Sequence, residues 1–219
     1  DIDDIDALYQ LVELGSQGPT PVATARYVER LQARRPARHF DELREQHTAL
    51  MRSRDRRDDA ALGTLVEELV RAAVTPTERV EALYHRGVFQ LRIARGDDDE
   101  AAATSARAAL TEAATLARSH GFGDLLYSVL LSLGNAWRSG PAPDLEHALA
   151  HYEEAELLAA PGRAQQATLW KVTADTLLVR AGPGDAARAL ALLEQSLAIR
   201  DRGWLRAETL MSAAKAECC

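Results

Sequence analysis

The chain has 219 residues, 47% of them apolar and 27% charged, so it is long enough to bury a substantial core. The aromatic content of 5% favours helix over sheet, and the net charge of −7 argues against a dedicated nucleic-acid surface. No apolar run approaches the roughly 20 residues of a membrane span, and the acidic start is unlike a secretory signal. Cysteine occurs only at Cys218 and Cys219, so no disulfide framework is expected and the cytoplasm is the predicted location.

Residues that start and stop helices divide the chain. Thr75-Pro76-Thr77-Glu78 predicts a capping box, and Asp124, Asp144 and Asp185 each precede an apolar stretch whose N–H groups they are expected to cap. Glycines that follow such stretches, where a left-handed residue commonly ends a helix, are Gly15, Gly121, Gly140 and Gly182. In chain order the predicted helices are 3–14, 21–34, 38–53, 58–73, 77–95, 99–119, 122–138, 144–159, 163–181, 185–200 and 204–217.

The apolar residues within these segments follow the spacing of three and four that marks one face of a helix. Two segments show it most clearly: Leu62, Leu65, Val66, Leu69, Val70 and Ala73, then Leu125, Val129, Leu130, Leu133 and Trp137. No strand pattern competes, so the sequence predicts an all-α protein of about eleven helices.

The sequence also repeats itself. A pattern of small, large, small and large residues on one helix face recurs after 42 and then 41 residues. Its copies are Ala106, Leu110, Ala113 and Leu116; Ala148, Tyr152, Ala155 and Leu158; and Ala189, Leu193, Ser196 and Ile199, with a degraded copy at Leu65, Leu69 and Ala72. The preceding helices carry matching small residues at Gly87, Gly134 and Ala174, with Ala49 a weaker candidate. A fixed period of this length predicts one helical hairpin per repeat. The small residues are expected at the contact between its two helices, because helices approach closely only where side chains are small.

The most complete unit resembles a known family. Leu133-Gly134-Asn135-Ala136-Trp137, followed by Ala148, Tyr152, Ala155 and Pro161, resembles the tetratricopeptide repeat. The resemblance implies a right-handed α-solenoid of stacked antiparallel hairpins over 76–219, with the last repeat incomplete. Residues 1–75 are then an N-terminal helical region, either divergent repeats or a separate cap. The long period resembles bacterial arrays associated with CHAT (caspase-like) proteases or with transcriptional and NTPase regulators.

In this family the first helices of successive repeats line a concave groove that holds a peptide. Carried over by position, the resemblance selects Tyr84, Val88, Arg92, Leu131, Asn135, Arg138, Lys171 and Asp175. Asn135 and Lys171 resemble residues with which relatives grip a peptide backbone or its terminal carboxylate, by charge-assisted hydrogen bonds.

The last predicted helix aligns with the first helix of a further repeat, since Ala214 lies 40 residues after Ala174. Without a partner helix it is expected to expose Trp204 and Leu210. We therefore expect the native protein to continue beyond this helix, or the helix to dock on another chain, with self-assembly as one possibility.

Other candidate sites have simpler interpretations. His147 and His151 have the spacing of two metal ligands, with Glu154 nearby, but a zinc site wants three or four ligands and no third is identifiable. Residues 26–57 hold ten arginines and five acids, with only Tyr27 and Phe40 to stack on bases, so arginines in solvent or paired with Glu29, Glu42 and Glu45 are expected instead of a nucleic-acid site.

No phosphate loop or nucleophile motif is present, so the sequence predicts neither an enzyme nor a cofactor. The expected function is a non-catalytic scaffold that binds a partner protein or peptide, as the regulatory portion of a larger bacterial protein. A CHAT-protease or regulator-associated region and a self-assembly module remain alternatives.

Overall fold

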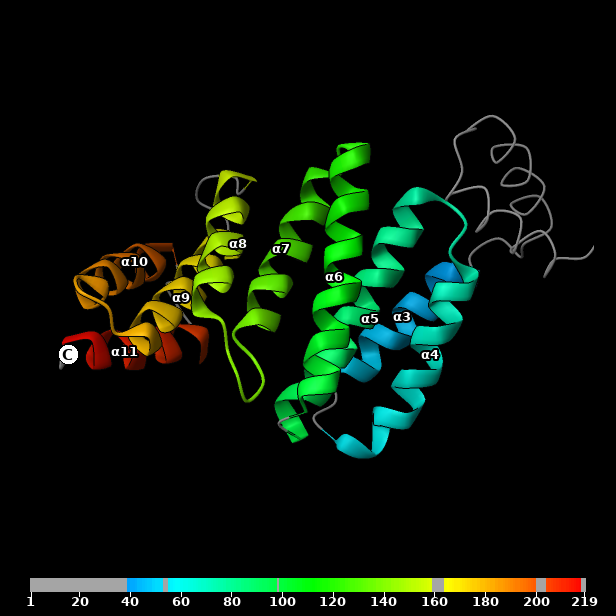
Figure 1. Ribbon diagram of the computed structural model, residues 1–219, viewed down its shortest axis with the longest axis horizontal. Coiled ribbons are helices and arrows are strands. Elements are labelled where there is room, and N and C mark those ends of the chain that lie inside the picture. The colour runs from blue at the N-terminus through cyan, green and yellow to red at the C-terminus, as the bar shows by residue number, and fades with distance from the viewer. Residues whose placement is uncertain (1–38, 53–54, 98, 159–163, 200–203, 218–219) are drawn as a thin grey trace, which may run out of the picture. The chain divides into compact units, whose positions relative to one another are not determined.

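The computed structural model describes residues 39–52, 55–97, 99–158, 164–199 and 204–217. These residues form an all-helical array without strands (Figure 1). They belong to two compact units, one ending at Phe89 and one beginning at Gln90, whereas the sequence predicts a boundary at 75/76. The helices expected at 3–14 and 21–34, and the two cysteines, lie outside the described residues.

Every helix expected within these ranges is present, and each observed end lies within two residues of the expected one. The helices are α3 (His39–Arg52), α4 (Asp59–Ala72), α5 (Pro76–Asp97), α6 (Glu100–His120), α7 (Gly123–Trp137), α8 (Leu145–Leu158), α9 (Ala164–Arg180), α10 (Asp185–Ile199) and α11 (Trp204–Glu217). A short 3-10 turn, Arg56–Asp58, leads into α4.

The first unit packs α3, α4 and the start of α5 around one apolar cluster. Phe40 and Leu43 from α3 meet Leu69 and Ala72 from α4 and Ala82 from α5. Ala49 is exposed, so the weak expectation that it marks a close helix contact is wrong. Its small size is not needed there, because that side of α3 faces solvent.

Polar contacts in this unit cap the start of α5 and form ion pairs between helices. The predicted capping box is confirmed: the Glu78 backbone N–H donates to Thr75 Oγ1 at 3.2 Å, and Glu78 Oε2 accepts from the Thr75 N–H at 3.0 Å. Arg44 pairs with Asp41 and with Glu81 of α5, each at 2.9 Å. Arg44 therefore binds carboxylates other than the three glutamates expected from the sequence.

In the second unit, helices adjacent in sequence are adjacent in space. Contacts run from α6 to α7 and onward in order to α11, and α11 also touches α9. Figure 1 shows α7 beside α8 and α10 beside α9, as short connections between helices require. This part of the chain is thus built from packed helix pairs.

The contact between α7 and α8 depends on Gly134. A Cβ atom built at this position would lie 2.3 Å from Tyr152 Cε1, well inside van der Waals contact. Tyr152 is 1% exposed, and its hydroxyl donates to Asn135 Oδ1 at 2.9 Å. The missing side chain of Gly134 makes room for the tyrosine ring, as the sequence analysis expected of the small residues.

The repeated pattern coincides with burial at its first three positions. Ala106, Leu110 and Ala113 in α6, Ala148, Tyr152 and Ala155 in α8, and Ala189, Leu193 and Ser196 in α10 are at most 1% exposed. Among the predicted small residues, Gly87, Gly134 and Ala174 are buried as well. The fourth position does not follow, because Leu158 is 40% exposed and Leu116 and Ile199 are only half-buried. The buried stripe therefore ends one turn earlier than expected.

Polar side chains connect helices two apart in the sequence. On one set of helices, Arg138 Nη1 donates to Thr176 Oγ1 (3.4 Å, α7 to α9), and Ser212 Oγ donates to Asp175 Oδ1 (2.7 Å, α11 to α9). On the other set, Arg118 pairs with Glu154 at 2.8 Å and Arg188 with Glu153 at 2.9 Å. These contacts link α6, α8 and α10 to one another separately from α7, α9 and α11.

Some of the expected helix ends are wrong in detail. Asp144 caps α8, since its Oδ1 accepts from the His147 N–H at 3.0 Å, but Asp124 lies inside the first turn of α7, where Phe122 is the cap residue. Asp185 instead binds Arg180 and the Gly182 N–H, and these hydrogen bonds, with Arg180 first, lower its pKa to about 2.

The left-handed residue after α9 is Ala181 (φ 53°), not Gly182. The Gly182 N–H donates to Asp185 Oδ2 at 2.8 Å, and the left-handed residue lies one position earlier than expected. Gly121, by contrast, ends α6 with φ 70° as expected.

Candidate functional site

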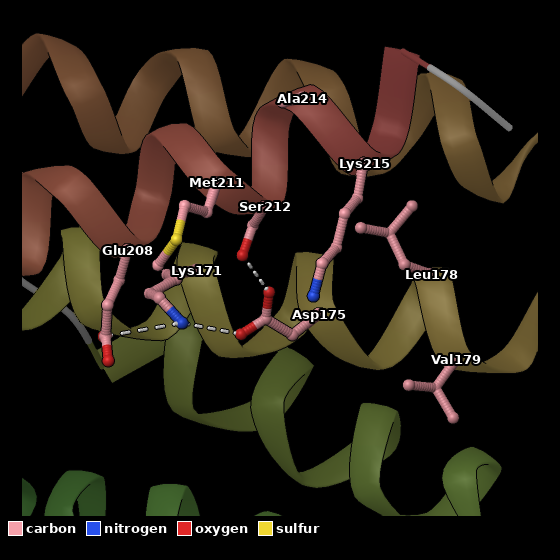
Figure 2. Close-up of a pocket in the computed structure, with 9 residues that line it drawn as sticks. All are labelled: Lys171, Asp175, Leu178, Val179, Glu208, Met211, Ser212, Ala214 and Lys215. Carbon is pink, nitrogen blue, oxygen red and sulfur yellow. Dashed lines mark hydrogen bonds and ion pairs between the residues drawn. The ribbon is translucent and has the colours of Figure 1, made fainter.

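An open groove of about 830 Å³ lies between α9 and α11 (Figure 2). It is lined by Lys171, Asp175, Leu178 and Val179 of α9 and by Glu208, Met211, Ser212, Ala214 and Lys215 of α11. Two of the eight groove residues selected from the sequence, Lys171 and Asp175, are therefore brought together at one surface.

Charged and polar side chains form a chain of contacts along one side of the groove. Lys171 Nζ lies 2.7 Å from Asp175 Oδ2 and 3.9 Å from Glu208 Oε2, as the dashed lines in Figure 2 show. Asp175 Oδ1 accepts from Ser212 Oγ. Because two carboxylates already flank the ammonium group, its charge is largely compensated and its attraction for a ligand carboxylate is reduced.

Beside this network the groove presents apolar side chains to solvent. Val179 is 65% exposed and Met211 is 61% exposed, and Leu178 lies next to them. Large apolar side chains in a concave surface are the usual anchors for a protein segment, and methionine adapts to partners of different shape. This surface can therefore bury apolar side chains of a ligand next to a fixed pattern of charge.

Asn135 and Arg138 take part in a different polar layer. Asn135 accepts from the buried hydroxyl of Tyr152, and Arg138 reaches Thr176 on α9. Burial raises the pKa of Tyr152, so this hydroxyl stays protonated as a donor. Nearby, Arg95 Nε donates to Ser139 Oγ at 3.1 Å. Both predicted groove residues thus help to join neighbouring helices in this structure.

The remaining predicted residues are spread along the array. Leu131 and Arg92 are half-buried on α7 and α5 in the second unit. Tyr84 and Val88 are half-buried in the first unit, and the Tyr84 ring lies 5.5 Å from His85. The structure does not bring these four residues to the groove of α9 and α11.

Sequence reasoning missed the α11 side of the groove. Met211 lies 40 residues after Lys171, and Lys215 lies 40 residues after Asp175, the two predicted residues of α9. The spacing that linked Ala174 to Ala214 would have found them, had it been applied to the groove positions as well.

Of the two candidate metal ligands on α8, His147 has two neighbouring partners. His147 Nδ1 lies 2.7 Å from Asp144 Oδ2, and its ring stacks on Trp137 at 4.7 Å. Burial lowers the pKa of His151. Within the described ranges no three His, Cys, Asp or Glu side chains are grouped as metal ligands.

The first unit holds a second pair of histidines that the sequence analysis did not single out. The rings of His47 and His85 meet edge to face, with centroids 4.6 Å apart. His47 is 1% exposed, and neither of its ring nitrogens has a hydrogen-bond partner. Burial lowers the pKa of His47 to about 4 and is also the main cause of the similar value for His85. Both rings are therefore neutral at neutral pH.

Comparison with protein-family models, with curated proteins and with solved structures finds no match. Among the helices of the described residues, none has the length and apolar character required to cross a membrane.

Proposed function

We propose that this chain is a non-catalytic binding module that holds a segment of a partner protein in the groove between α9 and α11. The observation that carries the proposal is the exposure of Val179 and Met211 at the groove, beside the paired charges of Lys171, Asp175 and Glu208. An apolar anchor site with a polar rim is the arrangement that protein-binding surfaces share.

The finer fold assignment belongs to the same proposal. Packed helix pairs, burial of the repeated pattern and polar contacts between alternate helices support a tetratricopeptide-like solenoid. In such an array the groove is formed by the first helices of two successive units. A module of this kind serves as the regulatory or scaffolding part of a larger cytoplasmic protein.

Selection of peptides from a random displayed library tests the proposal. The substitutions Val179→Asp and Met211→Asp together place two charges on the apolar part of the groove, and both sites are exposed, so folding should be retained. The matched control is Leu157→Asp, since Leu157 is 87% exposed on α8 and lies outside the groove.

We expect selected peptides to bind the parent and the Leu157 variant alike, and to lose at least about tenfold in affinity for the groove variant. Peptides that bind all three proteins equally would place the binding surface elsewhere and contradict the proposal.

A further inference from the structure

Two guanidinium groups of the second unit have no carboxylate partner. The Arg95 guanidinium of α5 bonds to Ser139. The guanidinium of Arg138, the residue that follows α7, bonds to Thr176 of α9. Within the part of the chain that the structure describes, neither arginine forms an ion pair. Other arginines of the same unit do bind carboxylates, namely Arg107, Arg118, Arg180 and Arg188.

The partners of these two guanidinium groups are uncharged acceptors. Arg95 Nε donates to Ser139 Oγ at 3.1 Å, and Arg138 Nη1 donates to Thr176 Oγ1 at 3.4 Å. Each hydroxyl donates its own proton, at 2.7 Å, to a backbone carbonyl four residues earlier in the chain. Ser139 and Thr176 are both buried. The hydroxyls therefore hold the guanidinium groups in place without neutralising them, and the Nη groups of Arg95 bond to none of the described residues.

The two guanidinium groups also lie close to one another and to the hydroxyl of Tyr152. Arg95 bonds to the residue directly after Arg138. Desolvation, and then the charge of Arg138, lower the pKa of Arg95, so the two cations repel each other. Burial raises the pKa of Tyr152, and the charges of Arg138 and Arg95 both oppose that rise. Arg95 is nevertheless exposed and Arg138 is half-buried, so a ligand can reach both from solution.

A carboxylate on α9 lies near this pair but is already engaged. Asp175 precedes Thr176, and its charge also acts on the Tyr152 hydroxyl. However, Asp175 Oδ2 lies 2.7 Å from Lys171 Nζ, and its other oxygen accepts from Ser212. The charge of Asp175 is therefore shared with Lys171, and the two arginines keep an excess of positive charge.

We infer that Arg95 and Arg138 together bind a phosphate monoester group. Such a group carries about two negative charges at neutral pH, which two guanidinium groups balance, whereas a carboxylate balances only one. Its oxygens match the planar N–H fork of arginine. Inorganic phosphate and a phosphorylated side chain of a partner protein present the same chemistry, and the experiment has one arm for each. The inference is independent of the proposed groove function, because neither arginine lines the groove.

The first arm uses a fluorescent pool of random peptides with a fixed central phosphoserine, and otherwise identical pools with serine or glutamate at that position. Binding to the whole chain is followed by fluorescence anisotropy. The second arm compares thermal denaturation in inorganic phosphate and in chloride of equal ionic strength. The variants are Arg95→Gln and Arg138→Gln, and the matched control is Arg188→Gln, which removes a guanidinium of α10 from its pair with Glu153. Circular dichroism checks that all three variants fold.

We expect the phosphoserine pool to bind the parent at least about tenfold more tightly than the other two pools, and each of Arg95→Gln and Arg138→Gln to remove this preference. The control variant should retain it. Stabilisation by inorganic phosphate that both arginine variants lose, without a preference for the phosphoserine pool, would support the site with the free ion as its ligand. The inference would be overturned if neither arm shows phosphate binding, if either arginine variant retains it, or if the glutamate pool binds as tightly as the phosphoserine pool.

Discussion

The two compact units differ in whether the buried polar side chains described here have hydrogen-bond partners. In the second unit Tyr152 donates to Asn135, Tyr127 donates to the Gln165 carbonyl at 2.7 Å, and Ser196 donates to the Ala167 carbonyl at 2.8 Å. In the first unit His47 is equally buried and both of its ring nitrogens lack a partner.

This difference has a physical consequence. A buried polar group with a partner fixes the register of the helices that share it, and the second unit uses one such bond at each of several helix contacts. A buried imidazole without a partner contributes no such bond and tolerates only its neutral form. We therefore expect the stability of the first unit to depend on pH, and the stability of the second unit to depend on how well the side chains at its helix contacts fit together.

The largest expected effect is loss of stability of the first unit in acid. The unfolded chain takes up protons at His47 near its ordinary pKa of 6.5, whereas the folded unit resists protonation until the pKa of about 4. Stability is therefore complete above pH 6.5 and falls as the pH is lowered to about 4, by about 3 kcal/mol for His47 alone. His85 adds to the fall, since burial, His47 and Arg44 all oppose its charged form.

Amide hydrogen exchange measures the loss of stability in acid for each helix separately. After correction for intrinsic rates, protection in α3 and α4 should fall more steeply between pH 7 and pH 4.5 than protection in α7 and α8. His47→Phe keeps an aromatic ring at the site and should flatten the dependence of α3. An equal fall in all four helices would erase the contrast between the two units.

The next effect concerns the fit of α7 to α8. Gly134→Ala should destabilise the second unit by about 2 kcal/mol, because crowding against Tyr152 outweighs the better helix propensity of alanine. Gly123→Ala in the same helix is the control, since a Cβ atom there meets nothing within 4 Å. Urea denaturation followed by the fluorescence of Trp137 and Trp170 measures both.

A double variant makes the comparison sharper. The α9–α10 pair carries alanine and leucine, Ala174 and Leu193, where the α7–α8 pair carries glycine and tyrosine. Gly134→Ala combined with Tyr152→Leu copies the smaller pair and should recover at least half of the stability lost in Gly134→Ala. If Tyr152→Leu lowers the stability of Gly134→Ala further instead, the sizes of these two side chains do not determine the fit of α7 to α8.

The smallest effect concerns a single hydrogen bond. Ser196→Ala should cost about 1 kcal/mol, because it removes a buried bond from α10 to α9. Ser212→Ala also removes a hydrogen bond, but at the half-buried edge of the groove, and should cost less than half as much. Thermal denaturation of the two variants under the same conditions gives the ratio, and equal losses would remove the distinction between buried and exposed contacts.

Much of the helix pattern could be predicted because its signals are local. The capping box at Thr75 and Glu78, the left-handed Gly121 and the cap at Asp144 depend on residues within one helix turn, and all three are confirmed. The capping role expected of Asp185 at the start of α10 was wrong, because this carboxylate binds Arg180, whose guanidinium lies 2.6 Å away, instead of the N–H groups of its own helix. A partner across a turn changes the role that local sequence gives to a residue.

The candidate site was less accessible to sequence reasoning. Lys171 and Asp175 could be selected by position, and their spacing of four residues on one helix allows them to pair, but the bond of Asp175 to Ser212 depends on how α11 lies against α9. The isolation of His47 likewise depends on α5, which brings His85 to its ring instead of a hydrogen-bond partner. The contact of Asp175 with Ser212 joins residues 37 apart, and His47 and His85 are also on different helices, so local patterns do not encode these contacts.

The central claim is that a partner segment binds in the groove between α9 and α11. Amide hydrogen exchange of the whole chain, with and without a saturating amount of a library-selected peptide, tests it most directly. We predict that added protection is confined to α9 and α11, with α6 and α8 unchanged. Protection that appears in α6 or α8 and not in α11 would contradict the account.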